Sequence, residues 1–172
     1  MKNICYVLML LLIVVSCQKP NKIGYVDNGT VINDYQAKKD VESRFKTKEA
    51  SFTKKFDSID NAFQIDVQKF QVSARSMSQK KAEARYQELG QLKQINDQQK
   101  QQEAQQLTQE FQTEIDTLIV RVKNFVKDYG KKNGYTYILG TSDAAASVLY
   151  GTNDNDLTQT ILDALNAEYK KE

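Results

Sequence analysis

The sequence predicts an α+β protein in which a long antiparallel helical hairpin, a coiled-coil arm, projects from a small β-containing body. Residues 36–132 are dominated by Lys, Glu, Gln, Asp and Ser with singly spaced apolar residues, and the one proline, Pro20, precedes them. Residues 23–35 and 133–172 instead carry short strand-like alternations such as YTYIL. A hydrophobic share of 40% and a mean hydropathy of -0.61 allow only a small core, so we expect the middle segment to extend into solvent.

The N-terminus is predicted to be a signal peptide. Lys2 precedes an apolar run from Ile4 to Val15, which has the length of a signal-peptide core and is too short to span a bilayer. The run ends in VVSC, which looks like the lipobox of bacterial lipoproteins. We therefore expect residues 1–16 to be removed and Cys17 to be the lipid attachment site. The alternative is an ordinary signal peptide followed by an incidental cysteine.

A lipid on Cys17 determines the expected location. Residues 17–22 would form a lipidated linker, and several acyl chains on one residue give durable membrane anchoring. Gln18 stands where an aspartate would favour retention in the inner membrane. We thus expect a periplasmic protein whose N-terminal lipid anchors it to the outer membrane.

Two apolar stripes predict the two helices of the arm. The first, called the apolar stripe, follows an alternation of three and four residues that Glu49 and Asp66 interrupt. The serine-rich segment 73–81 between the stripes is the predicted tip, and Ser78 can cap the second helix. A reversal there would place Phe45 opposite Glu110. The apolar stripe comprises Phe45, Phe52, Phe56, Ile59, Phe63 and Phe70, and the second stripe comprises Phe111, Ile115, Leu118, Val122, Phe125 and Tyr129.

The apolar stripe is the candidate binding surface of the arm. Residues 96–106 contain no large apolar side chain, so the hairpin alone is expected to leave several rings of the stripe half covered. One interpretation is an adaptable apolar face for another protein. The other is that the rings pack on the aliphatic stems of Gln and Lys, or on a second subunit.

Basic residues gather at the predicted tip. Residues 69–85 carry five cations and only Glu83 in opposition, which can attract acidic partners or lipid headgroups. The alternative is a solvated helix end. Nucleic acid is not expected as a partner, because the net charge is only +2 and no stacking aromatics lie among these charges. The basic tip comprises Lys69, Arg75, Lys80, Lys81 and Arg85.

The body is predicted to contain short strands and one helix. A strand is expected at 23–26, a turn at 27–29 and a short helical turn before the arm begins. Further strands are expected within YTYILG and SVLYGT, followed by a final amphipathic helix with Asp156 as its N-cap. So few elements bury little surface and leave sheet edges open, which favours oligomerisation through the sheet. The residues expected in this interface are Ile23, Tyr25, Val26, Tyr137, Ile138, Leu139, Val148 and Leu149.

Catalytic chemistry is not expected. The chain has no His, and its two cysteines, Cys5 and Cys17, lie in the first seventeen residues. This excludes a Cys/His metal site or a cysteine nucleophile in the body. Without a phosphate-binding glycine loop, neither a cofactor nor an enzymatic activity is predicted.

Short motifs occur in a characteristic order at both ends of the mature chain and at the arm tip. They are Ile23, Tyr25, Val26, Asp27, Val31, Ile32 and Tyr35, then Ser76-Met77-Ser78, Lys132-Asn133-Gly134-Tyr135, Ile138, Leu139, Val148-Leu149-Tyr150, Asp156-Leu157-Thr158, Ile161, Leu162, Leu165 and Asn166. In this set the chain resembles the Skp/OmpH family of periplasmic chaperones.

The resemblance implies a fold and a function. The implied assembly is a jellyfish-like homotrimer, in which strands of three subunits form a central barrel and three arms surround a cavity. The implied function is that of an ATP-independent holdase that encloses unfolded outer-membrane proteins and prevents their aggregation. The alternative is a lipid-anchored coiled-coil scaffold or spacer that docks a folded envelope partner.

Overall fold

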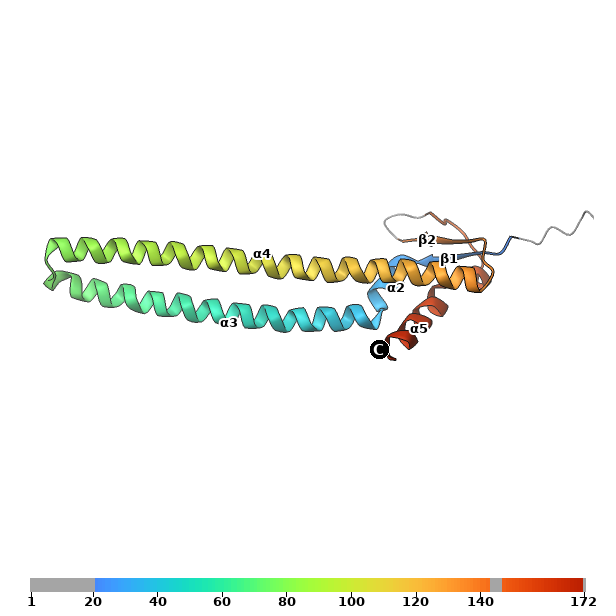
Figure 1. Ribbon diagram of the computed structural model, residues 1–172, viewed down its shortest axis with the longest axis horizontal. Coiled ribbons are helices and arrows are strands. Elements are labelled where there is room, and N and C mark those ends of the chain that lie inside the picture. Colours follow the sequence, from blue (N-terminus) through green and yellow to red (C-terminus); the bar gives the residue numbers. More distant parts are fainter. Residues whose placement is uncertain (1–20, 143–146, 172) are drawn as a thin grey trace, which may run out of the picture. The chain divides into compact units, whose positions relative to one another are not determined.

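The computed structural model describes residues 21–142 and 147–171 (Figure 1), so the predicted signal peptide and Cys17 lie outside the described residues. The chain divides into two compact units. The body comprises the described residues up to Val31 together with those from Val122 to Lys171, and the arm runs from Ile32 to Arg121.

Two long helices form the arm. The helix α3 (Gln36–Ser73) is followed by a 3-10 turn, η2 (Ala74–Ser76), and by α4 (Gln79–Lys132), whose last part belongs to the body. Figure 1 shows the two helices side by side and antiparallel. The backbone carbonyl of Ser78 accepts the amide proton of Ala82, so α4 starts directly after the predicted reversal. The predicted helical hairpin is confirmed, and the turn between its two helices spans residues 74–78.

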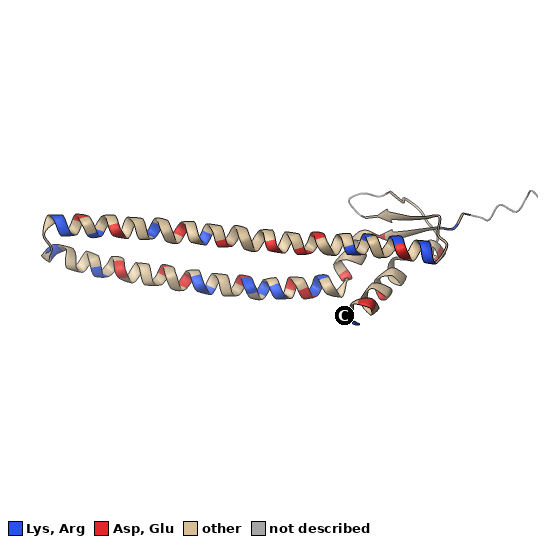
Figure 2. Cartoon of the chain, in the orientation of Figure 1, with Lys and Arg blue, Asp and Glu red and all other residues tan. Residues whose placement is uncertain are grey.

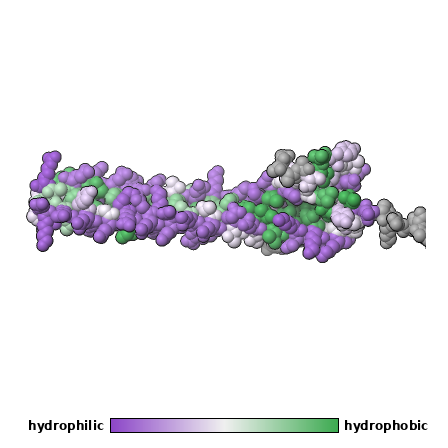
Figure 3. Space-filling view, turned by 90° about the horizontal axis from the view of Figure 1, so that it is seen from above, coloured by the Kyte–Doolittle hydropathy of each residue, from purple (hydrophilic) through white to green (hydrophobic). Residues whose placement is uncertain are grey.

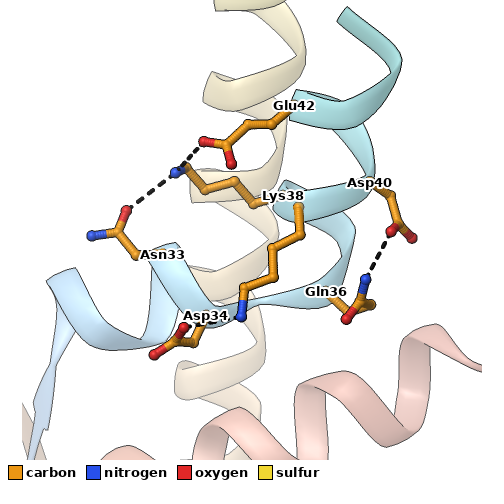
Figure 4. A network of polar contacts seen from close by, with 7 residues as sticks. Asn33, Asp34, Gln36, Lys38, Asp40 and Glu42 are labelled. Carbon is orange, nitrogen blue, oxygen red and sulfur yellow. Dashed lines mark hydrogen bonds and ion pairs between the residues drawn. The ribbon is translucent and has the colours of Figure 1, made fainter. Parts of the chain in front are cut away.

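A polar network connects the start of α3 to the residues that precede it (Figure 4). The helix α2 (Asn28–Asp34) ends one residue before α3, and Tyr35 between them is extended, with φ -62° and ψ 123°. The ammonium of Lys38 reaches Asn33 at 3.2 Å and Glu42 at 2.6 Å, and that of Lys39 reaches Asp34 at 3.0 Å. These contacts bridge the break between the two helices.

A two-stranded parallel sheet lies in the body. The strands β1 (Ile23–Asp27) and β2 (Tyr137–Thr141) pair in the register Ile23 with Tyr137 and Tyr25 with Leu139. Parallel strands need a crossover connection, because a tight hairpin would bring the chain back in the opposite direction. Here the crossover is formed by α2, α3 and α4, which explains why a long helix runs directly into a strand.

One face of the sheet packs against the core of the body. Gly24 and Val26 on β1 are buried, and the helix α5 (Thr158–Tyr169) contributes the buried side chains Ile161, Leu162 and Leu165. Leu157 lies so close to β1 that a Cβ on Gly24 would be 2.5 Å from its Cδ1. Only glycine fits at this position without displacing the leucine.

The predicted strand in SVLYGT is wrong. Residues 147–152 form neither helix nor strand, and the chain next pairs with β1 at an isolated bridge between Tyr25 and Asp156. The amide of Leu157 donates to the carbonyl of Tyr25 at 2.8 Å, which satisfies the backbone of β1 at this edge. A short 3-10 turn, η3 (Asn153–Asn155), directs the chain into this contact.

Two other predictions of local structure need correction, both at helix starts. The expected turn at 27–29 is instead the beginning of α2, because the Asp27 carboxylate accepts the amide proton of Thr30 at 3.0 Å and caps the helix. Asp156 likewise accepts the amide proton of Thr158 at 2.9 Å, but α5 begins at Thr158, with Leu157 in the capping position. Asp156 therefore supports the helix start from one residue further out than predicted.

Candidate functional site

Aromatic packing fixes the alignment of the two arm helices. The rings of Phe45 and Phe111 meet edge to face, with centroids 5.2 Å apart and planes at 63°. Glu110, the predicted neighbour of Phe45, instead binds the ammonium of Lys48 at 2.9 Å. The expected pairing is therefore wrong by about one position, and the actual alignment places the ring of Phe45 against the ring of Phe111.

Phe56 is the most deeply buried member of the apolar stripe, with 1% of its surface exposed. The ring of Phe52 lies 4.8 Å away, and the ammonium groups of Lys55 and Lys100 lie 5.2 and 5.8 Å from the centroid of Phe56. Lys100 belongs to the segment without large apolar residues. Lysine side chains thus cover this ring where facing hydrophobic residues are absent.

The structure separates the apolar stripe into two classes. Phe45 and Phe56 are buried and pack within the hairpin. The half-buried members retain accessible surface along the arm, and these are Phe52, Ile59, Phe63 and Phe70.

Five exposed apolar residues on the outer half of the arm were not predicted from the sequence, namely Ile65, Val72, Tyr86, Leu92 and Ile95. Val72 and Tyr86 are 79% and 71% exposed, and Ile65 and Ile95 are also exposed. Ile65 and Val72 are seven residues apart, so they share one face of α3 that lies off the apolar stripe. This heptad spacing was the available signal. On the face seen in Figure 3, such hydrophobic side chains are scattered among the hydrophilic ones that cover most of the arm.

Five ion pairs connect α3 to α4 and form a charge ladder along the arm. Figure 2 shows basic and acidic residues distributed along both helices. Nearest the start of α3 the cation lies on α3 and the carboxylate on α4, whereas nearer the tip the polarity is reversed. A sliding of one helix along the other would bring like charges together, so the ladder supports the observed alignment. The pairs are Arg44–Glu114, Lys48–Glu110 at 2.9 Å, Lys55–Glu103 at 2.5 Å, Asp60–Lys100 at 3.2 Å and Asp66–Arg85 at 3.7 Å.

Two carboxylates of the ladder have lowered pKa values. The hydrogen bond from Lys55 lowers the pKa of Glu103, with a smaller contribution from Gln99. The hydrogen bond from Lys48 likewise lowers the pKa of Glu110, with help from Gln106. Both carboxylates therefore remain charged to a lower pH than an isolated glutamate would.

The basic tip retains most of its charge unpaired. In the described part of the chain no ion pair involves Lys69, Arg75, Lys80 or Lys81. Arg85 differs, because it binds Glu88 at 2.8 Å, and the hydrogen bond to Glu88 raises the pKa of Arg85. Four of the five predicted tip cations are thus available to a partner.

The predicted interface residues of the body lie on different faces. Ile23, Tyr137 and Leu139 share the exposed face of the sheet. Leu149, which follows β2 in the sequence, is 91% exposed. Val26 is instead buried in the core of the body. The remaining predicted residues are partly exposed: Tyr25, Ile138 and Val148.

The described residues hold neither a metal cluster nor a membrane-spanning helix. No group of three or more His, Cys, Asp or Glu side chains there could hold a metal ion. None of the helices in the described ranges combines the length and apolar character needed to cross a membrane.

Comparison with known proteins identifies a family and similar solved structures. The model of the family described as outer membrane protein (OmpH-like) matches residues 22–165. A crystal structure from Caulobacter crescentus, described as a putative OmpH-like outer membrane chaperone, superposes with a TM-score of 0.77. It is 12% identical in sequence, and the match covers 88% of this chain and 87% of that chain. The search among curated proteins found no match.

Proposed function

Because the chain belongs to the OmpH-like outer membrane protein family, we propose that it is an ATP-independent periplasmic holdase chaperone. In this role its helical arms would enclose unfolded outer-membrane proteins and prevent their aggregation. The observation that carries the proposal is the arm itself, a long hairpin with half-buried Phe52, Phe63 and Phe70 and with exposed Val72 and Tyr86. Many shallow apolar contacts suit a non-native chain that must later be released.

Three arms around one cavity require an oligomer, and we propose a homotrimer. The exposed apolar face of the two-stranded sheet, with Ile23, Tyr137 and Leu139, supports an assembly through the body. A sheet of two strands is also marginal in isolation and gains stability from further strands. The number three comes from the family resemblance.

The basic tip would act in the capture of clients. Lys69, Arg75, Lys80 and Lys81 carry charge that no ion pair in the described residues neutralises, and such charge raises the rate of encounter with acidic segments. This attraction is long-ranged but screened by salt. Capture should therefore slow as the ionic strength rises.

The proposed location is the periplasm, with Cys17 lipidated and inserted in the outer membrane. The support is the lipobox-like VVSC at the end of the N-terminal apolar run. The substitution Cys17→Ser should move the protein from the membrane fraction to the soluble periplasmic fraction. If both forms fractionate alike, the lipid anchor is absent.

Aggregation suppression tests the chaperone function directly. A urea-unfolded outer-membrane barrel protein is diluted into buffer with and without the purified protein, and light scattering is followed. The holdase proposal expects scattering to be suppressed without ATP and with little dependence on which barrel protein is used. Stoichiometric capture of one folded envelope protein, with no suppression, would instead favour the scaffold.

A further inference from the structure

The two long edges of the arm, where side chains of α3 meet those of α4, differ in character. An α-helix turns by about 100° per residue. Lys48 and Lys55 therefore lie to one side of Phe52 around α3. Lys46 and Glu49 lie to its other side. We call the first side the ladder edge and the second the groove edge.

Ion pairs span the ladder edge. A shallow hollow on this side is lined by Lys48, Lys55, Glu103 and Glu110, which form two cross-helix pairs of 2.9 and 2.5 Å and neutralise one another. Phe52 and Leu107 also reach this hollow, but they lie there among charged side chains. The ladder edge therefore offers less apolar surface to another molecule than the groove edge does.

The groove edge carries more apolar surface. A groove of about 440 Å³ runs between the helices over Phe45, Phe52, Leu107 and Phe111. Within the described ranges, no ion pair crosses between the helices over this groove. The size lies in the range of natural small-ligand sites, which is enough for a few apolar side chains.

Glu49 gives the groove a charge preference. It interrupts the apolar stripe between Phe45 and Phe52 and lines the groove, and in the described part of the chain its carboxylate has no ion-pair partner. The rim also carries Lys46 and a second carboxylate, Glu42, which is shared with Lys38 on its own helix, so the groove lining holds two carboxylates and one ammonium group. An unpaired carboxylate beside apolar rings favours a cation whose surroundings are equally apolar.

We propose that the groove edge binds an apolar segment of a non-native polypeptide that carries a Lys or Arg. Its apolar side chains enter the groove over Phe52, Leu107 and Phe111, and its cation pairs with Glu49. The proposal rests on the proposed chaperone function and refines it, because it assigns one edge of the arm to this class of segment. The basic tip attracts acidic segments, whereas the groove edge binds a segment that carries a cation, so the two sites bind different parts of a client.

Site-specific photo-cross-linking tests where the client lies. Benzoylphenylalanine is placed at Thr108, which lines the groove, or at Gln106, which lines the hollow of the ladder edge two residues away on α4. The probe is a urea-unfolded outer-membrane barrel protein diluted into buffer with the full-length protein. We expect several-fold more cross-linked client from position 108 than from position 106. Equal yields, or more from position 106, would overturn the proposal.

Filling the groove gives a second test that separates shape from general hydrophobicity. Ala104→Phe adds an aromatic ring to the groove, whereas Gln106→Phe adds the same ring to the ladder edge. Groove binding predicts that Ala104→Phe weakens client retention several-fold and that Gln106→Phe does not. If both variants retain client equally well or better than the original chain, apolar area alone determines binding and the groove is not the site.

Charge reversal at Glu49 tests the preference for a cation. Two fluorescent leucine-rich peptides differ only in carrying a central Lys or a central Glu. The chain should bind the Lys peptide several-fold more tightly, and Glu49→Lys should abolish or reverse this preference. Asp128→Lys makes the same change from a carboxylate to an ammonium on the exposed surface of the body, outside both the groove and the basic tip, and should leave the preference intact. Equal binding of both peptides, or a preference that survives Glu49→Lys, would contradict the assignment.

The aggregation assay separates this proposal from the function on which it depends. If the original chain suppresses aggregation but position 108 does not cross-link, the holdase function stands and the groove assignment fails. If the original chain retains no unfolded protein, both fail together.

Discussion

Lys55 on α3 and Glu103 on α4 are joined by an ion pair of 2.5 Å, and the ammonium of Lys55 also lies 5.2 Å from the ring centroid of Phe56. One lysine thus connects the charge ladder to the buried part of the apolar stripe. The arrangement explains how a helix pair rich in glutamine and charge stays paired in a region without facing hydrophobic residues. It also leaves the opposite edge of the arm uncovered.

Phe56 should be the most sensitive stripe position for arm stability. Because its ring is almost fully buried, Phe56→Ala removes packing on both helices and should lower the free energy of unfolding by about 3 kcal/mol. Urea unfolding followed by far-ultraviolet circular dichroism measures the change. Phe63→Ala, at a half-buried position, is the control and should cost clearly less. Equal costs would mean that Phe56 is not the packing centre of the hairpin.

The charge ladder should make the arm sensitive to acid. The pKa values of Glu103 and Glu110 are lowered in the folded hairpin by Lys55 and Lys48, from an ordinary value of 4.5. The unfolded chain therefore binds protons first as the pH falls, and this stabilisation, complete above pH 4.5, is lost as the pH drops through the lower folded values. Thermal unfolding between pH 7 and pH 3 should show a falling midpoint. Glu103→Gln together with Glu110→Gln should flatten that part of the profile.

Gly24 should not tolerate a side chain. A Cβ there would lie 2.5 Å from Leu157 Cδ1 and 3.1 Å from Tyr135 Cε1, so Gly24→Ala forces the strand or the leucine to move. The expected loss is about 1–3 kcal/mol in the stability of the body. Hydrogen exchange of the β1 and β2 amides localises the effect. Exchange that remains unchanged would show that the body accommodates the methyl group.

Gly90 should behave in the opposite way. It lies within α4, and a Cβ there would meet no atom within 4 Å. Gly90→Ala should therefore stabilise the arm by about 1 kcal/mol, since alanine favours the helix more than glycine does. The same urea unfolding detects the gain. A loss of client retention in this variant, despite the higher stability, would identify Gly90 as a functional flex point of the arm.

The hairpin could be predicted from the sequence because its signal is repeated many times. The apolar stripe recurs every three or four residues from Phe45 to Phe70, and the serine-rich tip carries the only strong sign of a reversal. The alignment of the helices was missed by about one position, because it depends on the geometry of the turn at 74–78 and on cross-helix pairs such as Phe45 with Phe111. Neither the turn geometry nor these pairs can be read from the periodicity of the apolar residues.

The body was harder to predict than the arm. Apolar alternation in SVLYGT suggested a strand, but a strand also needs a neighbouring strand with free backbone groups. The backbone amide of Leu157 instead donates its hydrogen bond to the carbonyl of Tyr25 on β1. The start of α2 depends on a single side-chain cap from Asp27, which competes with the turn that Asn28 and Gly29 favour. The groove beside Glu49 was not predicted either, because it depends on which side chains of α4 lie against those of α3, and this follows only from the alignment of the two helices.

Native mass spectrometry with an unfolded client tests the central claim most directly. The purified protein is measured alone and after mixing with an outer-membrane barrel protein diluted from urea, and then with the same barrel protein already folded. The proposed chaperone should appear as a trimer that gains one unfolded chain and ignores the folded form. A monomer or dimer that binds neither form would contradict the account.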